Sequence, residues 1–351
     1  MREAWLVPFL SLLPPLALLS GCASKPPSPR LDGASARHYN TECKIFNQDG
    51  KVLRSYVGAQ CIFFKNGDFL STSYTDVTLY DRHMREVWRR DLATHHYAEL
   101  SRDGAAVYTL SSSVRHKNRY DVLLKLDLRT GKTLAEWDLL KHLDEFIKAI
   151  GFTKSVFLKT RRMEIPEPAR SYVKGRPPYE YTHFNSIREV GENEKGFFRP
   201  GQIVVSACCS GYVMVFDHEL RAPIHMLRLA PDDVLHSASV TREGNLLYFR
   251  NSQDGWQTKR STVEEYDPVQ RRVVRIFDGV KGKVPFNAPI HGFVDKIGDD
   301  RYLFTANGFA YETDREGNVF WSLDGEARAG IHILMPFKKE DLSEFLRNNE
   351  G

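Results

Sequence analysis

The chain has 351 residues, of which 42% are hydrophobic and 27% charged, and its formal net charge is +4. This hydrophobic content is sufficient for a packed core and argues against global disorder. The small net charge, without a basic run or an aromatic–basic stripe, argues against a nucleic-acid partner. A mild positive balance suits an anionic substrate without requiring one.

The first feature in chain order is an apolar segment that ends at a cysteine. Arg2 precedes the apolar residues 6–19, and the box Leu19-Ser20-Gly21-Cys22 closes the segment. A segment of this length is too short to cross a bilayer as a permanent helix. The pattern therefore predicts a lipoprotein signal peptide over residues 1–21, with acyl chains such as palmitate on Cys22. The alternative is an ordinary signal peptide that happens to end near a cysteine.

This signal predicts where the mature chain resides. We expect it to be lipid-anchored in a bacterial cell envelope and to face the periplasm. Position 23 is alanine, not the aspartate that often retains lipoproteins at the inner membrane, which favours the outer membrane. Residues 22–38 are rich in proline, serine and alanine, and are expected to form a flexible tether.

Four cysteines remain after Cys22, and in an oxidising compartment they can pair. Cys43 and Cys61 flank a segment that resembles a hairpin, with its turn at residues 48–50, so a disulfide between them is plausible. Cys208 and Cys209 are adjacent in the sequence. Because a vicinal disulfide is strained, we expect these two residues to remain separate thiols.

One pattern recurs along the rest of the chain. A short apolar strand ends in aspartate, a turn follows, and a second apolar or aromatic strand comes next. The aspartates are Asp49, Asp81, Asp127, Asp217, Asp267 and Asp314. Most are separated by about 48 residues or by about twice that, which is typical of the blades of a β-propeller.

We therefore expect an all-β fold with a single β-propeller domain over residues 39–340. Six blades, each a four-stranded antiparallel sheet, would use this length. The strand near Cys43 would complete the last blade and close the ring, and residues 341–351 would form a C-terminal tail. The alternative is a β-sandwich in which the spacing is accidental.

Two segments depart from the strand pattern. Apolar positions in residues 137–150 have helical spacing, which predicts a short helix. Residues 160–180 are rich in proline and arginine, and are expected to form a long loop between blades.

Histidines precede the signals for the inner strands of three blades. These residues are the pair His95-His96, His183 and His236. Because equivalent positions of different blades point at one central channel, the three segments are expected to converge on a site. No zinc-like ligand spacing accompanies them, and no glycine-rich phosphate loop is present, so neither a metal nor a cofactor is expected.

Five segments together resemble the bacterial arylsulfate sulfotransferases. They are residues 95–104, 121–139, 183–187, 236–247 and 260–268, and the resemblance covers roughly residues 43–325. It implies a six-bladed propeller that transfers a sulfuryl group between phenols. It also implies that the reaction uses no nucleotide donor such as PAPS and proceeds through a sulfated histidine. The expected ligands are a small aromatic sulfate ester and a phenol.

The resemblance also implies residue roles. His236 matches the nucleophile, whereas His96 (or His95) and His183 match the sulfuryl-binding and acid/base histidines. Asn185 would help to position His183. The predicted catalytic residues are His236, His183 and His96. The predicted substrate-binding residues are His95, Asn185, Arg260 and Arg250.

Two positions depart from the family pattern. Cys208 occupies the place of an arginine that would bind the sulfuryl oxygens, and Arg250 precedes Asn251 where the family has an acidic residue. Losing such a guanidinium would cost on the order of 3 kcal/mol of transition-state stabilisation. Arg250 or Arg260 could compensate from nearby strands.

This departure keeps two other functions open. The chain could be a non-catalytic propeller lipoprotein that binds a small anion or an envelope protein. It could also be a quinoprotein-type propeller, because residues 127–137 resemble a tryptophan-docking motif and Cys208-Cys209 is a vicinal pair.

Overall fold

The computed structural model describes residues 42–46, 52–58, 60–96, 98–165, 177–229, 233–254, 257–288, 291–306, 308–323 and 339–348. The predicted signal peptide, the lipidation residue Cys22 and the tether lie outside these ranges.

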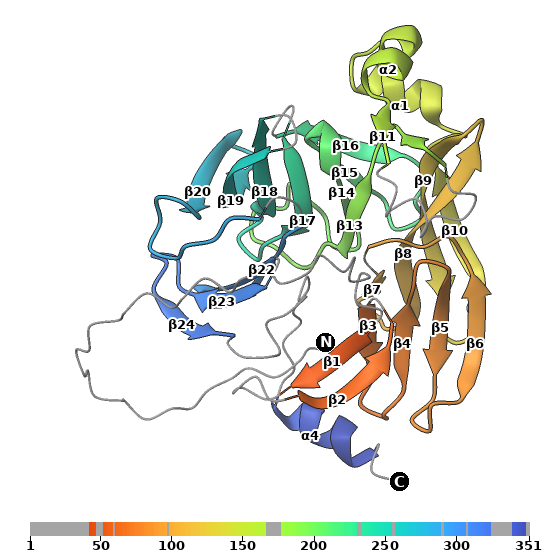
Figure 1. Cartoon of the computed structure of the whole chain (residues 1–351), viewed down its shortest axis with the longest axis vertical. Coiled ribbons are helices and arrows are strands. Elements are labelled where there is room, and N and C mark those ends of the chain that lie inside the picture. The colour runs from red at the N-terminus through yellow and green to blue at the C-terminus, as the bar shows by residue number, and fades with distance from the viewer. Residues whose placement is uncertain are drawn as a thin grey trace, which may run out of the picture.

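The described chain folds into β-sheets that surround a common centre (Figure 1). Four of these sheets are four-stranded and antiparallel, and the sheet of the second blade is extended to six strands by the insertion that follows it. The first blade contains β3 (Gln60–Phe63), β4 (Phe69–Thr72), β5 (Asp76–Tyr80) and β6 (Glu86–Asp91). The second contains β7 (Ala98–Leu100), β8 (Ala106–Arg115), β9 (Asn118–Asp127) and β10 (Thr133–Asp138). The third contains β13 (Phe184–Glu189), β14 (Ile203–Ala207), β15 (Tyr212–Phe216) and β16 (Pro223–Arg228).

Two further blades complete the series. The fourth contains β17 (Val234–Val240), β18 (Leu246–Asp254), β19 (Gln257–Asp267) and β20 (Arg272–Asp278). The fifth contains β21 (Phe293–Gly298), β22 (Arg301–Ala306), β23 (Phe309–Thr313) and β24 (Val319–Ser322). The predicted all-β propeller with four-stranded antiparallel blades is therefore confirmed.

Burial along the strands follows from this stacking of blades. In β14 and β15 every residue is buried, because neighbouring blades cover both faces of the strand. In β6, an outer strand, most residues are exposed. The inner strands therefore form a rigid frame around the centre, and the outer strands meet solvent.

The described residues form five blades, one fewer than expected. The strands β1 (Glu42–Phe46) and β2 (Val52–Val57) pair with each other as a two-stranded hairpin and do not complete the last blade. Asp49, the first of the aspartates predicted to mark blade turns, lies outside the described residues. The 90 residues from Asp127 to Asp217 contain a single blade and a helical insertion, not two blades.

A shared core joins the beginning of the propeller to its end. One hydrophobic cluster contains Ile45 and Tyr56 of the hairpin, residues of the first blade, and Leu303 and Ala310 of the fifth. The helix α4 (Lys339–Asn348) adds the fully buried Phe345, whose ring centroid lies 5.1 Å from that of Phe63. Part of the segment expected as a C-terminal tail is thus a helix packed on the core.

A disulfide also fixes the hairpin to the first blade. Cys43 of β1 is bonded to Cys61 of β3, and their Cα atoms are 6.0 Å apart. Cys208 lies in a short 3-10 turn after β14, is buried and forms no disulfide.

The insertion after the second blade is partly helical (Figure 1). It contains α1 (Leu143–Ala149), α2 (Lys154–Thr160), β11 (Met163–Glu164) and β12 (Tyr179–Glu180). The predicted helix begins six residues later than expected, because Trp137 and Asp138 pair with Leu123 and Val122 in β9. Residues 166–176 of the predicted loop lie outside the described ranges. Among the helices that are described, none has the length and apolar character needed to cross a membrane.

Candidate active site

Histidines from four consecutive blades occupy equivalent places in the fold. His95 and His96 lie just before β7, and His183 lies just before β13. His236 is on β17, and His291 lies just before β21. Each of these strands is the first of its blade, so the histidines converge from distant parts of the chain. The sequence analysis missed His291, although it also stands before the first strand of a blade.

The backbone is strained at two of these histidines and at the residue that follows a third. His96 has a φ angle of 60°, His291 of 70°, and Ser237, which follows His236, of 54°. Left-handed backbone at non-glycine residues costs on the order of 1 kcal/mol each and is concentrated at functional sites. The Ser237 hydroxyl exchanges hydrogen bonds of 3.1 Å with the N–H and the carbonyl of Val294 in β21. This contact holds the strained turn between two blades.

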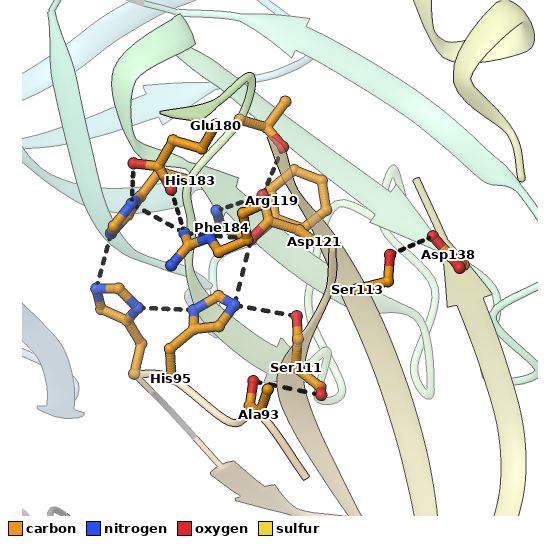
Figure 2. A network of polar contacts seen from close by, with 12 residues as sticks. Ala93, His95, Ser111, Ser113, Arg119, Asp121, Asp138, Glu180, His183 and Phe184 are labelled. Atoms are coloured by element: carbon orange, nitrogen blue, oxygen red, sulfur yellow. Dashed lines mark hydrogen bonds and ion pairs between the residues drawn. The ribbon is translucent and has the colours of Figure 1, made fainter. Parts of the chain in front are cut away.

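Three of the histidines form a hydrogen-bonded chain (Figure 2). Nε2 of His183 lies 3.1 Å from Nε2 of His96, and Nδ1 of His96 lies 2.9 Å from Nδ1 of His95. At one end, Nδ1 of His183 lies 2.8 Å from Oε1 of Glu180. At the other end, Nε2 of His95 lies 3.0 Å from the Ser111 carbonyl oxygen and 3.2 Å from Oδ1 of Asp121. All six ring nitrogens of the chain therefore have polar neighbours.

Arg119 of β9 places a buried positive charge beside this chain (Figure 2). Its Nη2 lies 2.6 Å from Oε2 of Glu180, 3.0 Å from Nδ1 of His183 and 3.6 Å from Oδ1 of Asp121. The sequence analysis missed both Arg119 and Glu180. No local motif marks them, because their partners are brought in by β12 and the segment that precedes β13.

Both carboxylates of the site are held in the ionised state. Burial alone would raise the pKa of Asp121, but the hydrogen bond from His95 and the charge of Arg119 hold it at about 2. Asp121 also accepts hydrogen bonds from the Thr182 hydroxyl and the Phe184 N–H. Burial opposes ionisation of Glu180 as well, and Arg119 and His183 outweigh it, so the pKa of Glu180 is lowered.

His236 is buried, with 3% of its surface exposed, and is tied to Asn251 of β18. Its Nδ1 lies 3.0 Å from Oδ1 of Asn251. Burial lowers the pKa of His236 well below its ordinary value, and His291 and His183 lower it further by charge repulsion. The His236 ring is therefore neutral at neutral pH.

The surroundings of His95 and His96 in the histidine chain also favour the neutral form of both rings. Burial lowers the pKa of His96 well below its ordinary value, with His183, His95, Arg119 and His291 adding repulsion. Burial and Arg119 lower the pKa of His95. His96 and His183 nevertheless remain partly exposed, with 25% of the His183 side chain accessible. Both residues thus keep some contact with solvent.

Comparison with known proteins finds a family similar to part of the chain. Residues 35–195 match the family described as arylsulfotransferase (ASST). This range contains the histidine chain, Arg119, both buried carboxylates and Asn185. This part of the β-propeller is therefore similar to the arylsulfotransferase family. The match ends before His236 and His291.

Two solved structures are similar to this chain at low sequence identity. A protein of unknown function from Bacteroides caccae has a TM-score of 0.53 at 14% identity, over 85% of this chain and 93% of its own. The Cps50 (Swd1) β-propeller domain from Myceliophteria thermophila has a TM-score of 0.46 at 16% identity, over 82% of this chain and 88% of its own. No match was found among curated proteins.

The side chains of Arg250 and Arg260, the predicted replacements for the family arginine, pair with carboxylates and not with the histidines. Cys208 donates its N–H to the His183 carbonyl oxygen at 2.8 Å, so this position supports the site through its backbone. Arg250 pairs with Asp233 and Glu264, and Arg260 pairs with Asp278. Within the described residues, the buried guanidinium beside the histidines is that of Arg119.

The side chain of Asn185 is hydrogen-bonded to the inner strands, including the strand that carries His236. Its amide nitrogen donates to the Leu235 carbonyl oxygen at 2.6 Å, and its oxygen accepts from the Ser206 hydroxyl at 2.5 Å. The side chain is fully buried. It therefore helps to position the strand that carries His236, and its role in positioning His183 or binding substrate stays a prediction. In the described part of the chain, no group of His, Cys, Asp and Glu side chains has a geometry that could hold a metal ion.

Proposed function

We propose that this protein transfers a sulfuryl group from a phenolic sulfate ester to a phenol, with His236 as the nucleophile that carries the group. The observation that supports this most is the state of the His236 ring. It is buried and neutral, and only one of its nitrogens faces Asn251. Such a ring presents a nitrogen lone pair for attack.

The orientation of the Asn251 amide determines which ring nitrogen of His236 carries the lone pair. The amide nitrogen of Asn251 lies 2.7 Å from the Ala288 carbonyl oxygen and 3.1 Å from that of His291. Carbonyl oxygens only accept hydrogen bonds, so the amide oxygen must face His236. Nδ1 of His236 therefore donates the hydrogen bond, and Nε2 keeps its lone pair.

The neighbouring charges suit a sulfuryl group. By analogy with phosphoryl transfer, the transition state should be loose, with negative charge spread over the non-bridging oxygens. Fixed positive donors near those oxygens supply much of the catalysis. Arg119 can provide this charge, because His183, which Arg119 contacts, lies close enough to His236 to lower its pKa.

The test is release of nitrophenol from 4-nitrophenyl sulfate by the purified protein, with and without a phenol acceptor. We expect release to depend on the acceptor and to be lost in His236→Ala. His225→Gln is the matched control, because this histidine stacks on Phe197 at 4.8 Å on the outer strand β16. Full activity in His236→Ala would refute the proposal. Sulfate binding without turnover would support a non-catalytic, anion-binding propeller instead.

We further propose that the protein works at the envelope surface, anchored through Cys22 and facing the periplasm. The cysteine box at residues 19–22 and the disulfide between Cys43 and Cys61 support this, since disulfides persist in oxidising compartments. Labelling cells with radioactive palmitate should mark the protein and leave Cys22→Ala unmarked. Equal labelling of both would exclude Cys22 as the acyl site.

A further inference from the structure

Two buried serines of the third blade are connected to the strand of the fourth blade that carries His236. Ser186 of β13 and Ser206 of β14 are opposite each other in the sheet, and their hydroxyl groups are hydrogen-bonded. The Ser186 hydroxyl also accepts a hydrogen bond of 3.0 Å from the Ala238 N–H in β17. Both serines and Ala238 have no exposed surface. Water therefore cannot easily replace these hydrogen bonds when one of them is lost.

Asn185 completes a path that returns to the same strand. Its amide nitrogen donates to the Leu235 carbonyl oxygen at 2.6 Å, and its oxygen accepts from the Ser206 hydroxyl at 2.5 Å. Since a carbonyl oxygen only accepts hydrogen bonds, the amide cannot be reversed, and Ser206 gives its hydrogen to Asn185. Ser206 must then accept from Ser186, whose oxygen accepts from Ala238. This one-directional path from Ala238 to Leu235 is called the serine clamp.

The two backbone groups that the serine clamp holds lie on either side of His236 and Ser237. The backbone is irregular there, because the pairing of β17 with β18 shifts between His236 and Ser239, and Ser237 has a φ angle of 54°. Strained backbone of this kind persists only where the surrounding structure holds it. The Ser237 hydroxyl is held by Val294 of the fifth blade, and the serine clamp acts from the third. The segment is therefore fixed from both neighbouring blades.

We propose that the serine clamp sets the position of the His236 ring for attack on sulfur, with Ser186 and Ser206 as positioning residues. The inference rests on the proposed function and extends it to residues that do not touch the substrate. The clamp fixes the backbone on both sides of the ring, and Asn251 holds Nδ1 at 3.0 Å, so Nε2 is fixed as well. Displacing a reacting atom by about 1 Å can cost about 10²-fold in rate.

The strands of the clamp also hold the backbone of His183. His183 directly precedes β13, and its carbonyl oxygen accepts a hydrogen bond of 2.8 Å from the N–H of Cys208, two residues after Ser206. The same two strands thus carry the clamp and one end of the histidine chain. A break in the clamp should therefore change the distance between His236 and the group of His183 and Arg119.

Ser186→Ala removes the acceptor of the Ala238 N–H. We would mix the purified variant with 4-nitrophenyl sulfate in the absence of acceptor and follow the first turnover, which reports transfer to His236. We expect this rate to fall by about 10²-fold, because the attacking nitrogen is displaced. Affinity for inorganic sulfate, measured by calorimetry, should stay close to that of wild type. A first turnover as fast as that of wild type would overturn the proposal.

Ser101→Ala is the matched control. The Ser101 hydroxyl accepts a hydrogen bond of 2.7 Å from the buried N–H of Ala106 and donates one of 2.6 Å to Asp103. Ser101 follows β7, whereas His96 precedes it, so this serine is at the opposite end of the strand from the site. The variant should lose a similar amount of stability and keep the wild-type rate. Equal loss of rate in both variants would mean that Ser186 acts only through stability.

Ser206→Ala breaks the serine clamp without leaving a backbone N–H unpaired, so it disturbs folding less than Ser186→Ala. It separates Ser186 from Asn185, and its first turnover should also be slowed. Because both serines act through one path, the double variant should be no slower than the slower of the two single variants. Losses that multiply in the double variant would contradict a single path.

Two spectroscopic measurements test the clamp without any transfer. In protein with ¹⁵N-labelled histidine, we expect the His236 ring signals to differ between wild type and Ser186→Ala and to be unchanged in Ser101→Ala. Hydrogen exchange at the Ala238 amide should be faster in Ser186→Ala. Unchanged His236 signals in Ser186→Ala would overturn the inference. A shifted ring in a protein without transfer activity would refute the proposed function alone, and transfer with an unshifted ring would refute the clamp alone.

Discussion

Arg119 brings a positive charge to the site and contacts several of its residues in fixed directions. Its guanidinium contacts Glu180 and His183 directly and lies 3.6 Å from Asp121. A lysine at this position would supply a point charge but could not reproduce several contacts in fixed directions. The side chain is almost fully buried, so water would not replace the lost contacts well.

We therefore expect Arg119→Lys to lower kcat for sulfuryl transfer by about 10²-fold. Arg250→Lys is the control, because the Arg250 side chain also pairs with two carboxylates, Asp233 and Glu264, and within the described part of the chain forms no hydrogen bond or ion pair with a histidine. Its kcat should stay within about threefold of wild type. Steady-state kinetics with 4-nitrophenyl sulfate would measure both. Equal losses in the two variants would mean that Arg119 acts only through stability.

At the scale of elements, adjacent blades are held together by contacts between an outer strand and a neighbouring turn. Trp88 of β6 donates its indole N–H to the Leu128 carbonyl oxygen at 2.8 Å, between β9 and β10 of the next blade. Arg90 donates to the Gly131 carbonyl oxygen at 2.7 Å. The indole lies against Gly131, where an added Cβ would be 2.7 Å from Cε3 of Trp88.

Gly131→Ala should therefore loosen the contact between the first two blades. Gly131 has a φ angle of +68°, and Gly104, with +71°, has open space around it. Gly104→Ala should lower the free energy of unfolding by about 1 kcal/mol, because alanine disfavours this backbone conformation. Gly131→Ala should lose about 1–3 kcal/mol more in free energy of unfolding, because the methyl group overlaps Trp88. Urea denaturation of both variants would measure the difference, and equal losses would argue against tight docking of Trp88.

At the scale of the whole molecule, the ring is sealed by segments from both ends of the described chain. Phe345 of α4 is fully buried among hairpin, first-blade and fifth-blade residues. Phe345→Ala should lower the free energy of unfolding by about 3–5 kcal/mol. Phe320→Ala on β24 is the control, since Phe320 is 53% exposed, and should cost about 1 kcal/mol or less. Similar losses would show that α4 contributes little to closing the ring.

Burial of the histidines also makes the stability of the whole molecule depend on pH. Burial lowers the pKa values of His95 and His236 below the ordinary value of 6.5. Below about pH 6.5 the unfolded chain therefore binds more protons than the folded chain, and the free energy of unfolding falls as pH falls. Each such histidine contributes a slope of up to about 1.4 kcal/mol per pH unit.

Denaturation at a series of pH values between neutral and mildly acidic would measure this slope. We expect His236→Gln to reduce it, because one buried neutral histidine is removed. The variant His225→Gln should reduce it less, because His225 is only partly buried on an outer strand. A stability that does not change with pH across this range would contradict the lowered pKa values.

The sequence by itself determined the kind of fold and its recurring unit. Each blade turn carries its own local signal, such as Asp127 accepting from Thr130 in the turn between β9 and β10. The histidines before the first strands and the family resemblance were also readable, because both rest on local segments. The number of blades was not, since the strand near Cys43, expected to complete the last blade, pairs with β2 in a separate hairpin.

Only the tertiary structure decided which polar groups meet at the centre. His96 and His183 are 87 residues apart in the sequence, and Arg119 and His183 are 64 apart. Hydrogen bonding and charge between such groups depend on strand register and on how blades stack, and no local pattern encodes either. Local turn chemistry and alternation therefore specified the blades, and long-range packing selected Arg119, Glu180 and His291 as neighbours of the predicted histidines.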